Sequence, residues 1–127
     1  NGIPYNEDYF YFGGYETEQG MRGCEYLMNL PSPPTAIFSI SDIIAIGAMN
    51  YALSKGYRIG KDLIFMGFDN IQYSHMFVPH LSTVEQPCYA QGKLVIEKLI
   101  ENMKATNPDH NLYTLPHSLV LRESTGD

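Results

Sequence analysis

The chain has 127 residues, a formal net charge of −6 and a hydrophobic content of 44%. This length allows one domain with a moderate hydrophobic core. The eight lysines and arginines are scattered singly, so the chain lacks the basic face that nucleic-acid phosphates require, and we do not expect it to bind DNA by itself. No apolar run approaches the roughly 20 residues of a membrane-spanning helix. The polar first residues are not those of a signal peptide, and the absence of an initiator methionine suggests a fragment or a processed product.

Signals for catalysis, metals and cofactors are weak in this sequence. Cys24 and Cys88 have no metal-type spacing, and we expect free thiols in a reducing cytoplasm rather than a disulfide. No G-x-S-x-G elbow surrounds Ser41, and neither a P-loop nor a G-x-G-x-x-G fingerprint is present, so no catalytic residue and no cofactor is predicted. No metal site is predicted either, because no pair of histidines has the one-turn spacing of a helical site; surface or capping roles are expected for His75, His80, His110 and His117.

The first part of the chain reads as a strand followed by a helix. Tyr9–Phe12 is strongly strand-forming and ends at two glycines. Thr17 is a candidate cap for a helix that runs to about Leu30 and is ended by prolines. Gly20 and Gly23 each cost this helix roughly 1 kcal/mol relative to alanine. We expect that a close approach of the helix to the sheet offsets this cost.

The next stretch predicts a strand, a helix and a second strand. Thr35–Ile40 and Leu63–Phe68 are uncharged runs that suit strands covered on both faces. Between them, Ile43–Lys55 has the apolar spacing of a helix with a broad buried face, and Gly56 suits its left-handed end. A crossover of this length joins parallel strands. The alternation of strands and helices therefore predicts an α/β fold with a parallel sheet.

The remaining elements are less regular. Ile71–His80 has no clear period but contains Met76, Phe77 and Val78, and such apolar residues in a loop are usually covered by a partner or a neighbouring domain. Ser82–Gln86 predicts a short strand, and Thr114–Arg122 predicts the last strand. Between them, Tyr89–Met103 predicts the most amphipathic helix of the chain, with an apolar side formed by Leu94, Val95, Leu99, Ile100 and Met103.

A binding site is expected where the strands end, because ligands of open parallel sheets bind beyond the carboxyl ends of the strands. Asp69 ends one strand, and its carboxylate can accept two hydroxyl groups of a sugar; the alternative is that Asp69 and Asn70 only turn the chain. One residue of the Ser41–Asp42 pair is expected to cap the helix while the other faces the crevice. Tyr15 could stack on an apolar sugar face or serve only in packing.

Several segments in combination resemble the lactose-repressor/galactose-repressor (LacI/GalR) family of transcription regulators. They are PTAIF followed by a small residue and Asp, an A-x-G-A helix, GFDN, L-S-T-V-x-Q-P, and L-V-x-R-E-S-T-G. The resemblance runs from about Gly13 to Gly126. It implies a truncated, doubly wound parallel-sheet subdomain of the periplasmic-binding-protein-like (type I) fold. Residues 1–127 would form the C-terminal part of the effector-binding domain, with a helix over residues 88–103 that returns to the N-terminal subdomain of a full-length protein.

The resemblance also implies roles for individual residues in effector binding. Asp69 matches the aspartate that bonds ligand hydroxyls in this family. Ser41 stands where the family usually has a ligand-bonding asparagine, which shortens the reach of this side chain. Tyr15 matches the aromatic residue that stacks on the ligand, and Gln86 is a weaker candidate that faces the crevice.

Family members pair side by side, and the resemblance places Ile46, Met76 and Phe77 in a homodimer interface. It also exposes what this chain does not contain. The helix-turn-helix headpiece, the hinge helix, most of the N-terminal subdomain, and the first strand and helix of the C-terminal subdomain are absent. An arginine that often clamps the sugar belongs to the absent part.

The sequence therefore predicts the effector-sensing portion of a cytoplasmic bacterial LacI-family repressor, which would bind a sugar-like effector and contact DNA only through the absent headpiece. The alternative is a periplasmic sugar-binding protein of a transport system; the regulator is favoured by the GFD, L-S-T-V-x-Q-P and REST segments. A third class, a sugar hydrolase that uses Asp69 with Asp42, has little support because nothing places the two carboxylates at a defined distance.

Overall fold

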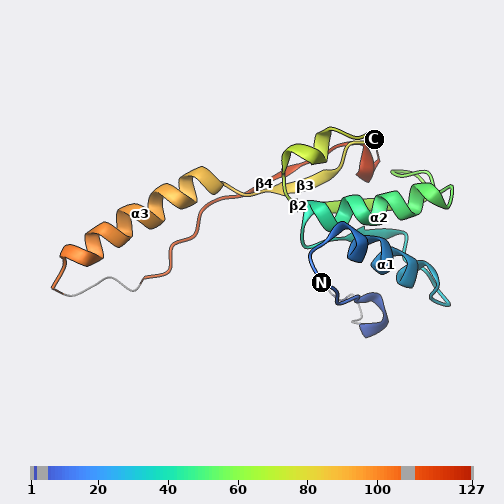
Figure 1. Ribbon diagram of the computed structural model, residues 1–127, viewed down its shortest axis with the longest axis horizontal. Helices are drawn as coiled ribbons and strands as arrows, with labels where there is room; N and C mark the ends of the chain where they lie inside the picture. Colours follow the sequence, from blue (N-terminus) through green and yellow to red (C-terminus); the bar gives the residue numbers. More distant parts are fainter. Residues whose placement is uncertain (1, 3–5, 107–110, 127) are drawn as a thin grey trace.

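The fold is built on one four-stranded sheet, seen in a computed structural model that describes residues 2, 6–106 and 111–126 (Figure 1). The strands lie in the order β1 (Ala36–Phe38), β2 (Ile64–Asp69), β3 (Ser82–Glu85) and β4 (Ser118–Val120). The first three run parallel, and β4 pairs with β3 in the antiparallel direction. The α-helices are α1 (Thr17–Met28), α2 (Asp42–Ser54) and α3 (Cys88–Lys104), and the short 3-10 helices are η1 (Glu7–Tyr9), η2 (Gln72–His75) and η3 (Glu123–Thr125).

The predicted strand–helix–strand unit is confirmed as β1, α2 and β2. Helix α2 begins where the Ser41 side chain accepts a hydrogen bond from the Ile44 amide, which satisfies one of the free donors at the helix start. The chain turns away after α2 at Gly56, whose φ of 84° is favourable for glycine because it has no Cβ. This unit positions two of the strand ends that carry the candidate site.

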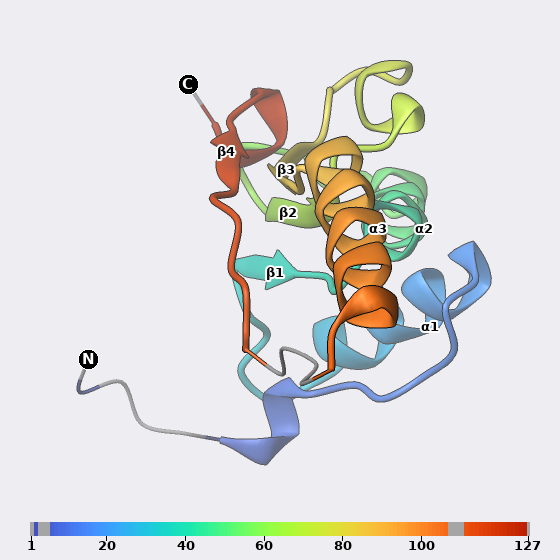
Figure 2. The same cartoon turned by 90° about the vertical axis from the view of Figure 1, so that its left-hand side faces the viewer.

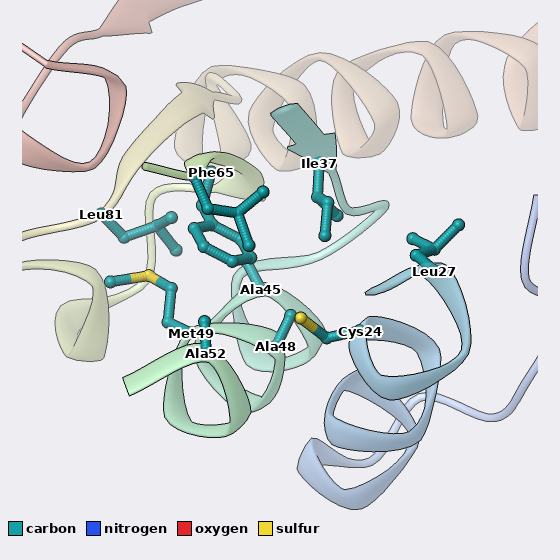
Figure 3. Packing of buried hydrophobic residues seen from close by; sticks show 10 residues of the cluster. Cys24, Leu27, Ile37, Ala45, Ala48, Met49, Ala52, Phe65 and Leu81 are labelled. Atoms are coloured by element: carbon teal, nitrogen blue, oxygen red, sulfur yellow. The ribbon is translucent and has the colours of Figure 1, made fainter. Parts of the chain in front are cut away.

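The hydrophobic core lies between the sheet and the two helices α1 and α2 (Figure 3). Phe65 of β2 is completely buried against small α2 side chains such as Ala45 and Ala48, which let the helix approach the strand closely. Cys24 of α1 joins the same cluster, and burial raises the pKa of its thiol to about 12. Cys24 and the exposed Cys88 are both free thiols, as predicted.

Helices α1 and α2 form a layer on one face of the sheet (Figure 2). Ile37 of β1 points into this core, whereas the next residue, Phe38, points to the opposite face and is 59% exposed. The parallel α/β class is therefore as predicted, with α1 and α2 as the helical layer on one face of the sheet.

Gly20 and Gly47 allow α1 and α2 to touch through their backbones. A Cβ atom at Gly20 would overlap the carbonyl oxygen of Ile44, and a Cβ atom at Gly47 would overlap that of Thr17. The sequence prediction that Gly20 and Gly23 permit a close approach to the sheet is wrong: Gly20 faces α2, and Gly23 faces the Tyr11 ring. The backbone-to-backbone contact between two helices offsets the unfavourable helix propensity of these glycines.

The predicted strand over Tyr9–Phe12 is also wrong. Tyr9 ends the 3-10 helix η1, and the following three residues belong to no strand. Strand propensity mainly reflects packing against neighbouring strands, and within the described residues no strand pairs with this segment. Instead, this segment contacts α1 through its aromatic side chains. The ring centroids of Tyr11 and Tyr26 of α1, for example, are 5.8 Å apart.

Helix α3 projects away from the rest of the protein (Figure 1). None of its residues is buried, although the predicted apolar side is present, with Leu99 54% and Met103 78% exposed. The described residues contain no helix with the length and apolar character needed to cross a membrane. The accessible surface of 8993 Å² exceeds the roughly 6,800 Å² expected for a compact protein of this mass, which fits a long uncovered arm.

Candidate functional site

The candidate site lies at one edge of the sheet, where the parallel strands β1, β2 and β3 all end. Ser41 follows β1, Asp69 is the last residue of β2, and Gln86 comes directly after β3. Asp69 and Glu85 are register partners in the β2–β3 ladder. The parallel topology therefore collects these side chains at the edge where α/β proteins bind ligands.

Asp69 and Gln86 are brought into direct contact, although they are far apart in the sequence. The Gln86 amide donates a 2.6 Å hydrogen bond to Asp69 Oδ1. Asp69 Oδ2 has no hydrogen-bond partner among the residues that the structure describes. Asp69 thus presents a half-buried carboxylate with one oxygen fixed and the other able to accept a hydroxyl group of a ligand.

The backbone at this strand end is strained. Asp69 has a φ of 113° and Asn70 a φ of 53°, and non-glycine residues rarely adopt such positive values. Each costs on the order of 1–3 kcal/mol and persists only where the surroundings enforce it. Strain of this kind is concentrated at functional sites, so it supports Asp69 as a candidate functional residue.

The expectation that one residue of the Ser41–Asp42 pair caps α2 while the other faces the crevice is right for the cap and wrong for the crevice, because Asp42 is buried. Ser41 is the cap, with its Oγ 3.4 Å from the Ile44 amide nitrogen. Asp42 is completely buried, where its carboxylate accepts hydrogen bonds from the Thr83 hydroxyl at 2.6 Å and the Ile71 amide at 2.9 Å. Burial raises the pKa of Asp42, and these two bonds oppose the rise. Asp42 is therefore a structural cross-link.

Gly67 makes the Asp42 cross-link possible. A Cβ atom at Gly67 would overlap the Asp42 carboxylate and lie 3.0 Å from the Leu81 side chain. The glycine of the GFDN segment, the aspartate after the PTAIF strand and Thr83 of the L-S-T-V segment thus meet at one point. The cross-link joins the start of α2 to β3 and to the turn after β2.

Sequence reasoning missed the role of Arg122. Its guanidinium donates to the Asn70 side-chain oxygen at 2.7 Å and to the Leu81 carbonyl at 2.5 Å. Arg122 lies 52 residues from Asn70 along the chain, so no local pattern could show this contact. The only sequence signal was its place in the L-V-x-R-E-S-T-G segment, which identified a family and not a contact.

Two buried serines attach the end of the chain to the sheet. Ser82 of β3 accepts a 2.7 Å hydrogen bond from the Arg122 amide. Ser124 accepts one of 2.8 Å from the Ser82 amide and donates one of 2.7 Å to the Phe65 carbonyl. The L-S-T-V and R-E-S-T segments are therefore two halves of one hydrogen-bonded unit.

The other predicted site residues are more scattered. Tyr15 is 74% exposed just before α1, and no contact between Tyr15 and Asp69 is found in the described part of the chain. Ile46 is only partly exposed because it packs against the core, whereas Met76 and Phe77, after η2, are 54% and 57% exposed. Within the described ranges, no group of histidine, cysteine, aspartate and glutamate side chains could hold a metal ion.

A groove adjoins the candidate site on the side of α3. Its volume is about 520 Å³, and it runs between α3 and residues 111–117. Gln86 and Phe68 lie at the end of this groove near the sheet, and Leu94, Lys98 and Tyr113 line its length. The groove is therefore continuous with the residue that holds Asp69.

Comparisons of this chain with known proteins all identify the same family. The chain matches the periplasmic binding protein-like domain family over residues 2–125. It is 42% identical over 98 residues to the probable HTH-type transcriptional repressor ExuR of Bacillus subtilis (strain 168), a stretch that covers 77% of this chain and 29% of that protein. The curated relatives are longer than this chain, which spans 29–38% of their length.

Solved structures agree with this assignment. A regulatory protein of the LacI family from Chloroflexus aggregans has a TM-score of 0.86 and 32% identity, covering 98% of this chain and 45% of that chain. A LacI family transcriptional regulator from Arthrobacter sp. FB24, in complex with lactose, has a TM-score of 0.75 and 26% identity, covering 87% of this chain and 41% of that chain. The chain thus belongs to the periplasmic binding protein-like family and, within it, to the LacI/GalR transcription regulators whose motifs it carries.

Proposed function

We propose that this chain is the effector-sensing portion of a LacI-family transcription repressor and that Asp69 binds hydroxyl groups of a sugar-like effector. The observation that carries the proposal is the Asp69 carboxylate at the carboxyl edge of the sheet, held through Oδ1 by Gln86 and left without a described partner at Oδ2. A carboxylate fixed in this way can accept charge-assisted hydrogen bonds from hydroxyl groups. The lactose complex of the Arthrobacter regulator supports a sugar as the class of ligand.

Three further residues complete the proposed binding set. Gln86 has a carbonyl oxygen that can accept from the same ligand while its amide holds Asp69. Ser41 lies at the neighbouring strand end, and its short side chain also caps α2, so its contribution would be small. The exposed Tyr15 ring would stack on the apolar face of the sugar once a ligand is bound.

Replacing Asp69 by Asn should weaken sugar binding by about 1.5–3 kcal/mol, the value of a hydrogen bond to a charged group. Asparagine tolerates positive φ, so the turn should persist. In the regulator that carries this chain, ribose, glucose, galactose and lactose would be screened by thermal shift, and the sugar that binds would be titrated by calorimetry. The control is Asp62→Asn, which changes an exposed carboxylate paired with Arg58. Unchanged affinity in Asp69→Asn, or binding of none of these sugars by the parent protein, would contradict the proposal.

The whole regulator would act on DNA through a headpiece outside this chain. Effector binding would change the arrangement of its subdomains and thus the spacing of two DNA-reading heads in a homodimer. We place this protein in the cytoplasm and propose no catalytic activity and no cofactor, in line with its repressor relatives. A periplasmic sugar-binding protein of a transport system is the less supported alternative, because the similar proteins are transcription regulators.

Two apolar surfaces of the chain are proposed as contact surfaces in the regulator. The first is the homodimer surface, formed by Ile46, Met76 and Phe77. The second is the apolar side of α3, residues 88–103 of which would pack in a second subdomain. The absence of buried residues in α3 supports the second proposal, since each apolar side chain gains roughly 1.5–3 kcal/mol when it is fully buried.

The isolated chain should self-associate at micromolar concentration, because both surfaces are then open to water. Sedimentation velocity would measure this. Phe77→Asp and Ile100→Asp should each weaken association, since these side chains are 57% and 46% exposed and the fold does not depend on them. Phe12→Asp, at a residue that is 89% exposed and lies before α1, outside both surfaces, is the matched control. A well-folded wild-type monomer throughout this concentration range would show that neither surface drives assembly.

A further inference from the structure

The strained turn at Asp69–Asn70 needs an external restraint. Its two residues have φ values of 113° and 53°, and nothing in an isolated Asp-Asn sequence would hold both in this region. The direction of the Asp69 carboxylate depends on this backbone conformation. Whatever fixes the turn therefore also fixes the group that we propose to bind the sugar.

Asn70 is held from several elements at once. Its amide nitrogen donates to Thr83 Oγ1 at 3.2 Å, and its Nδ2 donates to Glu85 at 3.3 Å. Its Oδ1 accepts from the Ser74 hydroxyl at 3.3 Å and from Arg122 Nη2 at 2.7 Å. The bond from Arg122 is the shortest of the four. It and the longer bond to the Glu85 carboxylate each involve a charged group, and such bonds are roughly twice as strong as neutral ones.

Arg122 is itself fixed at both ends. Its backbone amide is anchored by Ser82 Oγ at 2.7 Å, and its carbonyl oxygen lies 2.9 Å from the same hydroxyl. Its guanidinium Nη1 donates to the Leu81 carbonyl and, at 3.1 Å, to Ser74 Oγ. A planar guanidinium can make these contacts and still present Nη2 to Asn70, which a lysine ammonium cannot reproduce.

We infer that Arg122 is a positioning residue for effector binding: through the Asn70 side chain it holds the Asp69–Asn70 turn and so aims the Asp69 carboxylate. Arg122 acts on the turn and not on the sugar. The effect on affinity rests on the proposed function, whereas the effect on the turn can be measured without any ligand.

The test compares Arg122→Met and Arg122→Lys with the parent regulator. In ligand-free protein labelled with ¹³C at aspartate and asparagine, the Cα shifts of Asp69 and Asn70 report their φ values. Both shifts should move in Arg122→Met, and Arg122→Lys should not restore them. Arg58→Met removes an exposed arginine that pairs with Asp62 and is the control that should leave both shifts unchanged. Unchanged Asp69 and Asn70 shifts in folded Arg122→Met would overturn the inference.

The second readout is the affinity for whichever of ribose, glucose, galactose or lactose binds the parent protein. Arg122→Met should lower it roughly tenfold, as expected for one lost charge-assisted hydrogen bond. When Asn70 is replaced by Gly, Arg122→Met should lower the sugar affinity by less than about threefold, because glycine adopts positive φ without help.

A purely structural role would lower the melting temperature equally in both backgrounds and leave affinity unchanged, which would overturn the inference. The two proposals fail separately. If none of these sugars binds, the proposed function fails, and the Cα shifts still decide whether Arg122 holds the turn.

Discussion

Gly47→Ala is expected to lower the free energy of unfolding by about 3 kcal/mol or more, at the upper end of the usual cost of overpacking. The added Cβ would overlap the Thr17 carbonyl oxygen and lie 2.9 Å from its carbonyl carbon. These are backbone atoms, so no rotamer change can relieve the overlap, and α1 would have to move away from α2. The loss would be a large part of the 5–15 kcal/mol typical of a whole domain.

Urea denaturation followed by circular dichroism would measure this loss. Gly92→Ala in α3 is the matched control, because a Cβ atom there meets nothing within 4 Å. It should stabilise the helix slightly, since alanine has a better helix propensity than glycine. Gly20→Ala should resemble Gly47→Ala, because its Cβ would overlap the Ile44 carbonyl. Equal midpoints for Gly47→Ala and wild type would mean that the two helices do not touch as described.

Asp42→Ala should also destabilise the protein strongly, by about 3 kcal/mol. The substitution leaves the Thr83 hydroxyl and the Ile71 amide without their acceptor, and each hydrogen bond to a charged group contributes about 1.5–3 kcal/mol. Removing a buried carboxylate whose pKa is raised by burial offsets part of this loss. Asp42→Asn should cost less, because one amide oxygen still accepts one of the two bonds.

The Asp42 variants would be measured by the same urea denaturation at pH 7. Glu18→Ala is the control: it removes an exposed carboxylate that forms an ion pair with Arg22, and surface pairs contribute little. If Asp42→Ala and Glu18→Ala shifted the midpoint equally, the buried cross-link would have no special importance.

Local patterns in the sequence predicted most of the regular structure. The helix over Ile43–Lys55 and its flanking strands have clear boundaries, because uncharged runs, a cap and a terminal glycine all lie within the segment itself. Tyr9–Phe12 was mispredicted because its propensity says nothing about whether a neighbouring strand is present. The close contact of Gly20 was placed on the sheet instead of α2, since a glycine in a helix does not reveal which element approaches it.

The candidate site was predictable only in part, for a similar reason. Asp69 could be proposed from its place at a strand end, because that place follows from the parallel topology. Which of Ser41 and Asp42 would be buried depended on Thr83 and Gly67, which lie on other strands. The restraint on Asn70 by Arg122 spans 52 residues, and only the folded chain brings the two together.

The way in which α3 is attached to the sheet has a mechanical consequence. Only two stretches of chain join the α3 arm to the body, residues 86–87 after β3 and residues 111–117 before β4 (Figures 1 and 2). Two adjacent connections resist twisting of α3 relative to the body. They leave bending about the line that joins them comparatively easy, so this line is a hinge axis. Gln86 sits on that line and is hydrogen-bonded to Asp69. A molecule bound to Asp69 would therefore contact the protein next to this axis, where a small shift of the carboxylate would become a large displacement at the far end of α3.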